Sequence, residues 1–471
     1  MVPIALTLFA YSGALAIALP SSAPSTAVTV DKAVLSLSLE FFTFPGYTEI
    51  IATTNCINNI ATLRGTAPAV RIGGTTQDRA TYDPNLSEAV NYTVASAGDA
   101  PSTLTYGPSF FTLAAALPGE VTIGLNRRLN NQSNTLAAAK QAQSVMKNLL
   151  SIELGNEPDL YSSSDPIAGS SGWSSTADGA SEKAWETALA PSLGNVFQAG
   201  VYLSWSISNL IPLLGDAITY AKTFSHHSYP QSACGGASTN LQSLMSHSGI
   251  VSYTSQFKSD AAAVHAQGKN FYLAETNSAT CGGGGISPTF GAALWIVDYV
   301  LQGALNNVER LYFHQGTIGN CQYCFWGRFI VGAPFYGASF VSQFLGTDGA
   351  KLSMLDNGSG AVATYVVYSS SGTPLRALIY NSNYFNGSGT RSSTSVSLTN
   401  LTSSGNIRAL RLTAQNATSR VDEGGVVTIG GGQTFASDCT TSGSQTFESV
   451  TVSNGSATVT VNASEALTVY L

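Results

Sequence analysis

Short apolar runs alternate with helix-compatible segments through most of the first 345 residues, and this alternation limits the possible folds more than any other feature. Eight runs have the length and residue content of β-strands: 34–39, 69–72, 121–125, 152–154, 201–206, 223–226, 271–274 and 311–313. Segments between them, such as 136–150 and 289–305, have compositions that suit helices. Eight alternating βα units over this length predict a parallel (β/α)8 TIM barrel at residues 33–345.

The sequence changes character beyond residue 345. Short runs rich in Val, Thr, Ala and Tyr are separated by Gly, Asn and Ser, for example GAVATYVVYSSSG at 360–372 and SATVTVNASEALTVYL at 456–471. This pattern is typical of antiparallel strands and predicts a β-sandwich domain at residues 346–471. A short strand within residues 19–32 is expected to join that sandwich. Because no long Pro/Ser linker separates the two parts, we expect them to pack together.

The charge balance limits the classes of partner. The chain has 20 Lys and Arg against 27 Asp and Glu, a formal net charge of −7, and no cluster of basic residues. A protein that binds nucleic acid or an anionic membrane must neutralise phosphates with basic side chains. We therefore expect neither partner. The sequence does not set an oligomeric state.

The N-terminus indicates secretion. Residues 4–19 are apolar but too few to span a bilayer comfortably, and Ala16-Ile17-Ala18 has the small-x-small pattern of a cleavage site. We therefore expect residues 1–18 to be a signal peptide and the mature protein to be extracellular. Asn-x-Ser/Thr glycosylation acceptors agree with a secreted surface; they lie at Asn85, Asn91, Asn131, Asn357, Asn386, Asn400, Asn416, Asn454 and Asn462.

Six cysteines are expected to form disulfides in an oxidising compartment, and the sequence leaves the pairing open among 15 possibilities. The Cys321-x-x-Cys324 spacing raises zinc as an alternative, with Cys281 and His226 or His227 as further ligands. No second Cys-x-x-Cys pair accompanies it, so we expect neither a metal nor a cofactor.

Two glutamates follow two of the predicted barrel strands. In SIELGNEPDLY (151–161), Gly155 ends the fourth run and Glu157 lies between Asn156 and Pro158. Proline disfavours helix in the preceding residue, so Glu157 is expected to be extended or in a turn. Glu275 directly follows the seventh run in NFYLAETNS. Active sites of such barrels lie at the C-terminal strand ends, where the two carboxylates would face each other across one cavity. Paired carboxylates in this arrangement are what glycoside hydrolysis requires.

These residues resemble a known family. Asn156-Glu157-Pro158 together with Glu275 resembles the large clan of retaining barrel glycosidases. Within it the chain resembles glycoside hydrolase family 79, the β-glucuronidase and heparanase-related family, and especially its fungal secreted β-glucuronidases. The resemblance is carried by SLSLEFF (36–42), VRIGGTTQD (70–78), LGNEPDLY (154–161), SHHSYP (225–230), AETNSATCGG (274–283) and YFHQG (312–316). It spans essentially the whole mature chain.

The resemblance implies roles for four residues. Glu157 would be the general acid and then the base, and its pKa should be raised so that it is protonated when substrate binds. Glu275 would be the ionised nucleophile. Tyr229 would donate a hydrogen bond to Glu275, and Asn156 would donate to the sugar 2-hydroxyl. The implied reaction removes a terminal β-D-glucuronic acid, with or without a 4-O-methyl group, from a glycan or glycoside, with retention of configuration.

A glucuronide carries a carboxylate that the site must receive. An Arg clamp would be Arg71, on the second predicted strand. The alternative is recognition by backbone N–H groups around Gly282 and Gly283 together with the Tyr323 hydroxyl. The resemblance favours this second arrangement. Glu40, at the end of the first strand, is a candidate acceptor for the 3- or 4-hydroxyl.

Other functions remain as alternatives. Within the same clan they are a β-xylosidase or β-glucosidase and an endo-acting heparanase-like enzyme, although a sulfated polymer would favour clustered basic residues. A carbohydrate-binding protein without catalysis would explain the sandwich but not the paired acids. A serine hydrolase would need a Gly-x-Ser-x-Gly turn, which the sequence lacks.

Overall fold

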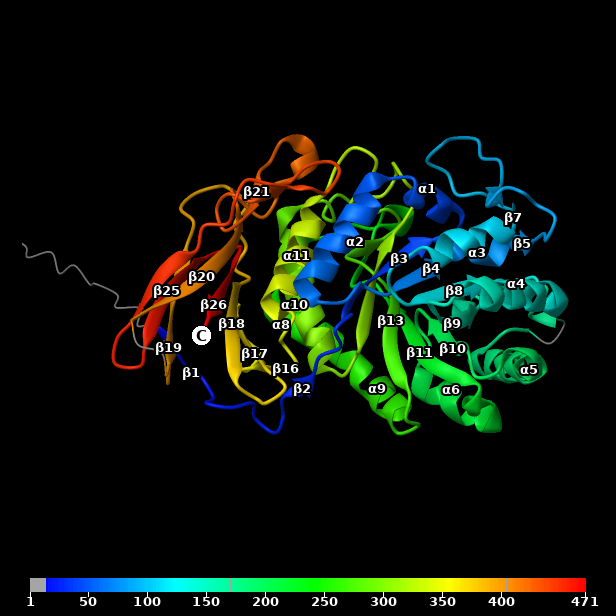
Figure 1. The fold of residues 1–471 in the computed structure, drawn as a ribbon, viewed down its shortest axis with the longest axis horizontal. Helices are drawn as coiled ribbons and strands as arrows, with labels where there is room; N and C mark the ends of the chain where they lie inside the picture. Colours follow the sequence, from blue (N-terminus) through cyan, green and yellow to red (C-terminus); the bar gives the residue numbers. More distant parts are fainter. Residues whose placement is uncertain (1–13, 170–171, 403–404) are drawn as a thin grey trace, which may run out of the picture.

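The computed structural model describes residues 14–169, 172–402 and 405–471. Two parts lie side by side, a barrel and a β domain (Figure 1). The barrel is a closed sheet of eight parallel strands, as the sequence predicted: β3 (Leu35–Glu40), β4 (Val70–Gly73), β8 (Val121–Leu125), β9 (Leu149–Leu154), β10 (Phe197–Tyr202), β11 (Ala221–Ser228), β13 (Asn270–Thr276) and β15 (Arg310–Gln315). β15 pairs with β3 and closes the barrel.

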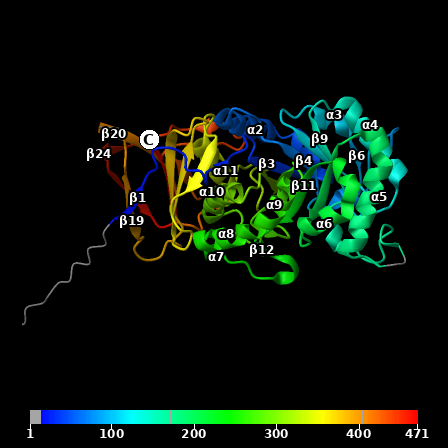
Figure 2. The ribbon, with the colours of Figure 1, turned by 90° about the horizontal axis from the view of Figure 1, so that it is seen from below.

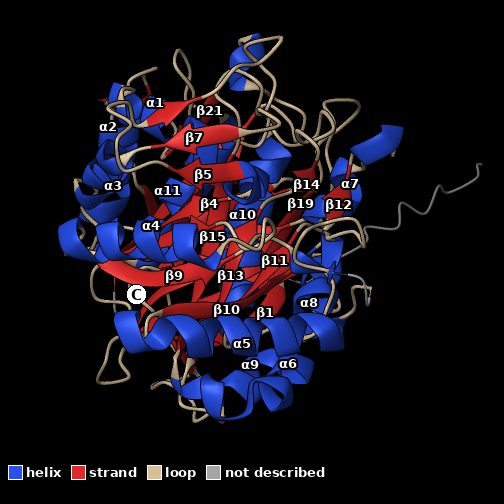
Figure 3. Cartoon of the chain, turned by 90° about the vertical axis from the view of Figure 1, so that its right-hand side faces the viewer, coloured by secondary structure: helices blue, strands red, loops and turns tan. Residues whose placement is uncertain are grey.

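Helices surround the barrel strands (Figure 3). They are α1 (Phe44–Thr48), α2 (Ile51–Arg64), α3 (Pro108–Ala115), α4 (Gln132–Val145), α5 (Ser175–Leu193), α6 (Ile207–Leu214), α7 (Leu241–Met245), α8 (His247–Thr254), α9 (Lys258–His265), α10 (Phe290–Leu305) and α11 (Ala333–Leu345). Helices α10 and α11 are buried along most of their length because they lie between the barrel and the β domain. The remaining short strands on this side are β5 (Ala80–Tyr82), β6 (Val90–Asn91), β7 (Leu104–Tyr106), β12 (Gln231–Ser232) and β14 (Ala279–Thr280).

Two elements differ from the sequence-based boundaries. The fifth strand was expected at 201–206, but β10 covers Phe197–Tyr202. Gly200 looks like a break before a strand, yet it lies inside β10 with φ of 91°, as part of a bulge. The helix expected at 136–150 ends at Val145, and Leu149–Leu154 belongs to strand β9. Apolar residues at a helix end and at a strand start are alike in sequence, so composition does not separate them.

The C-terminal region forms the predicted sandwich of two sheets. The larger, eight-stranded sheet contains β2 (Val28–Thr29), β16 (Lys351–Met354), β17 (Val362–Tyr368), β18 (Pro374–Asn381), β20 (Gly405–Ala414), β21 (Val427–Ile429), β24 (Glu448–Val452) and β26 (Glu465–Tyr470). The smaller sheet contains β1 (Leu15–Ala18), β19 (Ser393–Thr399) and β25 (Ala457–Asn462), and a separate pair is formed by β22 (Thr434–Phe435) and β23 (Thr441–Ser442).

The larger sheet is buried on both faces. Along β17, Tyr365 and Val367 pack into the same apolar core as the barrel helices, whereas Val366 and Tyr368 pack against the smaller sheet. This alternation follows from the two-residue period of a strand. The barrel core therefore continues into the β domain, and Figure 2 shows the two parts in contact from a second direction.

The N-terminal segment runs along the β domain before it enters the barrel. Val28–Thr29 pairs with β16, within the region 19–32 for which a joining strand was expected. Leu15–Ala18 pairs in parallel with β19, although these residues were assigned to the signal peptide. Removal of residues 1–18 would therefore leave β19 at the edge of its sheet. Residues 1–13 of the expected signal peptide lie outside the described residues.

The six cysteines form three disulfides, Cys56–Cys439, Cys234–Cys281 and Cys321–Cys324. The first joins barrel helix α2 to the β domain. Because every sulfur is paired, the zinc alternative at Cys321 and Cys324 is wrong. In the part of the chain that the structure describes, no helix combines the length and apolar character that crossing a membrane requires.

Candidate active site

A cavity of about 700 Å³ opens at the C-terminal ends of the barrel strands. Five polar residues from five different barrel strands or the loops after them line it: Glu40 of β3, Glu157 after β9, His227 of β11, Glu275 of β13 and Tyr323 after β15. Glu157 and Glu275, which are 118 residues apart in sequence, thus face the same space. The closed barrel brings the two glutamates together, as predicted from their positions at the C-terminal ends of two strands.

Glu275 is held as a carboxylate. Arg71 Nη1 lies 2.6 Å from Glu275 Oε2, and the Tyr229 hydroxyl donates to Oε1 at 2.8 Å. Burial opposes ionisation of Glu275, but the neighbouring His314, His227 and Arg71, with the Tyr229 hydrogen bond, outweigh it and hold its pKa well below the usual range. Of these groups Arg71 stays charged at every pH at which the protein is folded. Glu275 is therefore ionised at working pH.

Glu157 is held as an acid. Burial, followed by the charges of Glu275 and Asp159, raises the pKa of Glu157 to about 8. Its backbone is in a turn rather than extended, with a left-handed φ of 47°, and its N–H donates to the Val201 carbonyl at 3.1 Å. His227 Nδ1 lies 3.1 Å from Glu157 Oε1. Burial, then Arg71, lowers the pKa of His227 to about 4, so a neutral imidazole faces the protonated carboxyl between these values.

The two carboxyl groups approach each other closely. One oxygen of Glu157, one of Glu275 and a ring nitrogen of His227 lie within 4.8 Å of one another. Retaining glycosidases separate their carboxyl groups by about 5–5.5 Å, and inverting ones by about 6.5–9.5 Å to admit a water. A closest approach of oxygen atoms within 4.8 Å favours the shorter of these two spacings.

These three side chains are also of types that bind metal ions. Within the described residues they are the one group of this kind whose ligand atoms converge. Both oxygens of Glu275 already accept hydrogen bonds, from Arg71 and from Tyr229. The donor set therefore fits paired-carboxylate chemistry better than a metal centre.

Arg71 does not occupy the place that a substrate clamp would need. Its side chain is fully buried and does not line the cavity. It donates to Glu153 at 2.5 Å, to Asn156 Oδ1 at 2.8 Å and to Glu275. The suggestion that Arg71 receives the substrate carboxylate is therefore wrong, because protein acceptors already surround its guanidinium. Its hydrogen bond to Glu275 instead orients that carboxylate and stabilises its charge.

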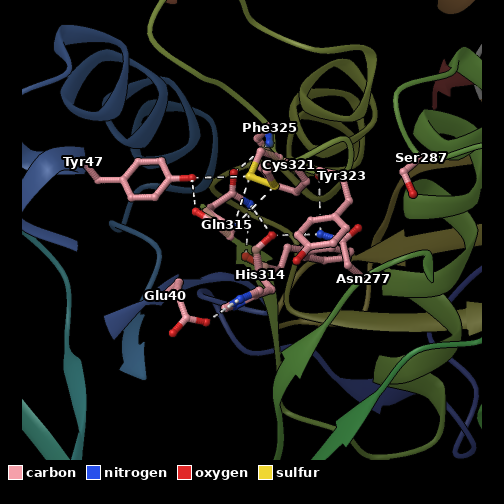
Figure 4. The surroundings of a disulfide bond; sticks show 12 residues. Glu40, Tyr47, Asn277, Ser287, His314, Gln315, Cys321, Tyr323 and Phe325 are labelled. Carbon is pink, nitrogen blue, oxygen red and sulfur yellow. Dashed lines mark hydrogen bonds and ion pairs between the residues drawn. A yellow bond between two sulfur atoms is a disulfide. The ribbon is translucent and has the colours of Figure 1, made fainter. Parts of the chain in front are cut away.

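Asn156 and Glu40 are oriented by neighbours. Since Arg71 donates to Oδ1 of Asn156, the amide nitrogen of Asn156 remains as a donor, the atom that contact with a sugar hydroxyl requires. Glu40 lines the cavity and accepts from the Thr76 N–H at 3.1 Å. Its other oxygen lies 3.5 Å from His314 Nε2, and Figure 4 shows the His314 ring directed at Glu40. Burial opposes charge on His314, but Glu275 and Glu40 outweigh it and raise the pKa of His314.

The expected carboxylate-binding groups lie in two places. Tyr323 lines the cavity, and its ring centre is 6.0 Å from that of His314. The glycine loop has φ of 88° at Gly282 and 106° at Gly283, conformations that residues with a Cβ rarely adopt. The Gly283 N–H already donates to the Thr280 carbonyl at 3.4 Å, and the cavity lining includes Cys281 rather than either glycine. Cys281 is therefore the residue of this cysteine–glycine loop that lines the cavity, whereas the Gly283 N–H is hydrogen-bonded within the loop.

Two histidines were not among the predicted site residues. His227 and His314 occur in the motifs SHHSYP and YFHQG, which carried the resemblance, but neither histidine was given a role in the reaction, and His227 was considered only as a zinc ligand. Both are buried polar residues near strand ends, at 0% and 4% exposure. The available signal was their position at the end of the sixth and eighth strands, on the same rim as Glu157 and Glu275. A histidine in a strand is equally consistent with the barrel core, so that signal is weak.

Comparisons with known proteins agree with this geometry. Residues 364–467 match the model of the glycosyl hydrolase family 79 C-terminal beta domain. A beta-glucuronidase of Aspergillus niger is 31% identical over 396 residues, which cover 75% of this chain and 72% of that protein. A beta-glucuronidase of Neurospora crassa is 30% identical over 382 residues, covering 70% and 66%.

A solved structure is also similar over almost the whole chain. It is the Rha-GlcA complex of a 4-O-alpha-L-rhamnosyl-beta-D-glucuronidase from Fusarium oxysporum 12S. It is 49% identical to this chain, covers 97% of it and 100% of its own length, and superposes with a TM-score of 0.94.

The fold, the facing carboxylates and these relatives define a barrel glycoside hydrolase with a C-terminal β-sandwich. A carbohydrate-binding protein without catalysis is thereby excluded. The chain belongs to glycoside hydrolase family 79.

Proposed function

We propose that this enzyme is a retaining β-glucuronidase that removes a terminal β-D-glucuronic acid from a glycan or glycoside. One observation carries the proposal: an oxygen of Glu157 lies within 4.8 Å of an oxygen of Glu275, and the pKa values of the two carboxyl groups are shifted in opposite directions. A pair of acids whose environments separate their pKa values is the pattern expected of an acid and a nucleophile. The beta-glucuronidase relatives support glucuronic acid as the sugar.

The reaction then proceeds in two displacements. Glu157 gives its proton to the glycosidic oxygen while a Glu275 oxygen attacks the anomeric carbon, so that the bond to the leaving group breaks and a glycosyl ester forms. Glu157, now ionised, takes a proton from water, and the water oxygen displaces Glu275 from the anomeric carbon. The two inversions give net retention. Asn156 donates to the sugar 2-hydroxyl, a contact that strengthens in the transition state.

A panel of aryl β-glycosides tests the substrate assignment. Glucuronide, glucoside and xyloside with the same leaving group should be compared side by side on the purified enzyme. We expect the glucuronide to have the highest kcat/KM. A higher value for the xyloside or glucoside would instead favour one of the related glycosidase activities.

A 4-O-substituted glucuronide is a second candidate substrate, and the cavity size favours it. Pockets of about 300–1,000 Å³ hold ligands of drug size, so a cavity of about 700 Å³ has room for more than one sugar ring. The similar structure from Fusarium oxysporum is of a 4-O-alpha-L-rhamnosyl-beta-D-glucuronidase. Aryl glucuronides with a free, a methylated and a rhamnosylated 4-oxygen would show which form this enzyme prefers.

We also propose that the substrate carboxylate is read by neutral donors, the Tyr323 hydroxyl and N–H groups of the loop around Cys281 and Gly282. Tyr323 and Cys281 both line the cavity, and no Lys lies among the lining residues in the described part of the chain. Backbone N–H groups in a loop of positive φ can form an anion-binding nest. Gly283 shapes the loop but does not offer a free donor, because its N–H donates to the Thr280 carbonyl.

Removal of the Tyr323 hydroxyl should separate glucuronide from glucoside turnover. A hydrogen bond to a charged group contributes about 1.5–3 kcal/mol, which corresponds to a loss of roughly 10- to 150-fold. We expect Tyr323→Phe to lower kcat/KM for an aryl glucuronide by that factor. The matched glucoside, which lacks the carboxylate, should change far less. Equal losses on both substrates would show that Tyr323 acts through packing.

The pKa of Glu157 sets the alkaline limit of activity. Because Glu157 must be protonated to act as the acid and its pKa is raised to about 8, kcat/KM for a phenyl glucuronide should fall only as pH rises through that value. Because the pKa of Glu275 is held well below that of an ordinary glutamate, Glu275 stays ionised in acid solution, and activity should persist at pH values below the ordinary glutamate pKa. A 2,4-dinitrophenyl glucuronide, whose leaving group needs no proton, is the control and should lack this alkaline fall. A fall near pH 4.5 would contradict the assignment.

We propose that the mature enzyme is extracellular and glycosylated. Three disulfides support an oxidising compartment. Seven of the nine glycosylation acceptors are exposed: Asn85, Asn91, Asn131, Asn357, Asn386, Asn400 and Asn454. N-terminal sequencing and glycosidase-sensitive mobility of the secreted protein would test both points.

A further inference from the structure

Strand β10 ends in a bulge with an unusual backbone. Gly200 has φ of 91° and Val201 has φ of 63°. The pairing with β11 skips one residue there, because Gly200 lies opposite Ser225 and Tyr202 lies opposite His226. A β-branched residue with positive φ is a true outlier and persists only where the surroundings impose it. The bulge therefore needs a support that outweighs its strain.

Helix α5 supplies that support from outside the barrel. Glu182 Oε1 accepts the Gly200 N–H at 2.9 Å, and Asp178, one turn earlier, accepts the Tyr202 hydroxyl. Glu182 is 2% exposed, so the bond is shielded from water. A Cβ at Gly200 would lie 2.4 Å from Ile207 Cδ1 and 3.0 Å from the Ser225 carbonyl oxygen, so the bulge also fits closely against its neighbours.

The inner side of the bulge contacts the general acid. The Val201 carbonyl accepts the backbone N–H of Glu157 at 3.1 Å. Beyond the bulge, the N–H groups of Leu203 and Ser204 donate to Asp159 at 3.1 and 2.5 Å. The turn that carries Glu157 is thus fastened to the end of β10 on both sides of Pro158.

We propose that Glu182 is a positioning residue for catalysis: by holding the Gly200–Val201 bulge, it fixes the backbone of Glu157 and so the direction of the acid's proton. The inference rests on the proposed function, which makes Glu157 the general acid. Glu182 does not line the cavity. Its effect passes through the bulge and one backbone hydrogen bond.

Two substitutions separate this role from simple packing. Glu182→Leu removes the acceptor and leaves the buried Gly200 N–H without a partner, which allows the bulge to relax and the Val201 carbonyl to turn away from Glu157. Glu182→Gln is the matched control because it keeps an acceptor oxygen at the same reach. Burial, then Asp178, raises the pKa of Glu182 to about 7, so an uncharged amide resembles the acid below that pH.

The readout is how strongly the rate depends on the leaving group. Proton donation contributes about 10²–10⁴-fold to such a reaction. We expect Glu182→Leu to lower kcat/KM for a phenyl glycoside about 10- to 100-fold, a part of that range. The 2,4-dinitrophenyl glycoside of the same sugar should change by no more than about threefold, since its departure needs little proton donation. Glu182→Gln should match the wild type on both.

Three results would overturn the proposal: equal losses on both substrates, a Gln variant as impaired as the Leu variant, or a Leu variant without loss. If Glu182→Leu does not fold, as judged by circular dichroism, Glu182→Asp replaces it, because the shorter side chain withdraws the acceptor and should shift the ratio in the same direction. If the wild type cleaves a glucoside or xyloside instead of a glucuronide, the proposed function fails. The same ratio measured on that sugar still tests Glu182.

Discussion

Glu275→Gln should abolish hydrolysis of an aryl β-glucuronide, with kcat lowered on the order of 10⁴-fold or more, as for removal of other enzymic nucleophiles. The amide is nearly isosteric: its oxygen can still accept from Arg71, which lies 2.6 Å from one carboxylate oxygen, and its NH2 group can donate to the Tyr229 hydroxyl oxygen, which lies 2.8 Å from the other. It cannot form the glycosyl ester. The fold should therefore remain intact, with an unchanged melting temperature within a few degrees.

A mechanism-based fluoroglycoside identifies the nucleophile directly. In the wild type the label should be found by mass spectrometry on the peptide that contains Glu275, and in Glu275→Gln no label should form. Glu88→Gln is a suitable control because Glu88 is an exposed acid outside the cavity. A label on any other acid would falsify the assignment.

Glu157→Ala should have the second largest effect, and its size should depend on the leaving group. Loss of general acid–base catalysis is expected to lower kcat/KM for a phenyl glucuronide about 10²–10⁴-fold. For the 2,4-dinitrophenyl glucuronide, kcat/KM should be nearly unchanged, because formation of the glycosyl ester then needs no acid. Its kcat should still fall, since Glu157 no longer activates the water that cleaves the ester.

Azide provides an independent check on Glu157. As an anion it needs no base to attack the glycosyl ester, so it should restore the kcat of Glu157→Ala on the dinitrophenyl substrate and give a β-glycosyl azide. The wild type should be insensitive to azide under the same conditions. An α-glycosyl azide, or no restoration at all, would assign Glu157 another role.

The sequence predicted the barrel and the two facing acids because both depend on a local pattern. Alternating strands and helices predict the closed parallel sheet. Because all its strands run in the same direction, every glutamate that directly follows a strand lies at the same end of the barrel. Glu157 and Glu275 could be placed by this rule without knowledge of any side-chain contact.

The supporting groups could not be predicted in the same way. Arg71 was considered as a partner of the substrate, but it binds Glu153, Asn156 and Glu275, which lie 82 to 204 residues away in sequence. Nothing near Arg71 in sequence indicates which acids surround it. The bulge in β10 was missed for a related reason: a glycine before an apolar run looks like a strand boundary, and only the pairing of Gly200 with Ser225 on β11 shows that the strand continues through it.

The order in which the paired segments occur along the chain has a consequence for biosynthesis. Strand β2 pairs with β16, the first barrel strand pairs with the last, and Cys56 bonds to Cys439, 383 residues later. A ribosome delivers the early partner of each pair long before the late one. The emerging N-terminal segment must therefore wait, with an open sheet edge and an unpaired thiol, until nearly the whole polypeptide has been made. We expect this enzyme to complete its fold after synthesis rather than domain by domain, and truncated nascent chains to remain protease-sensitive until the β domain has emerged.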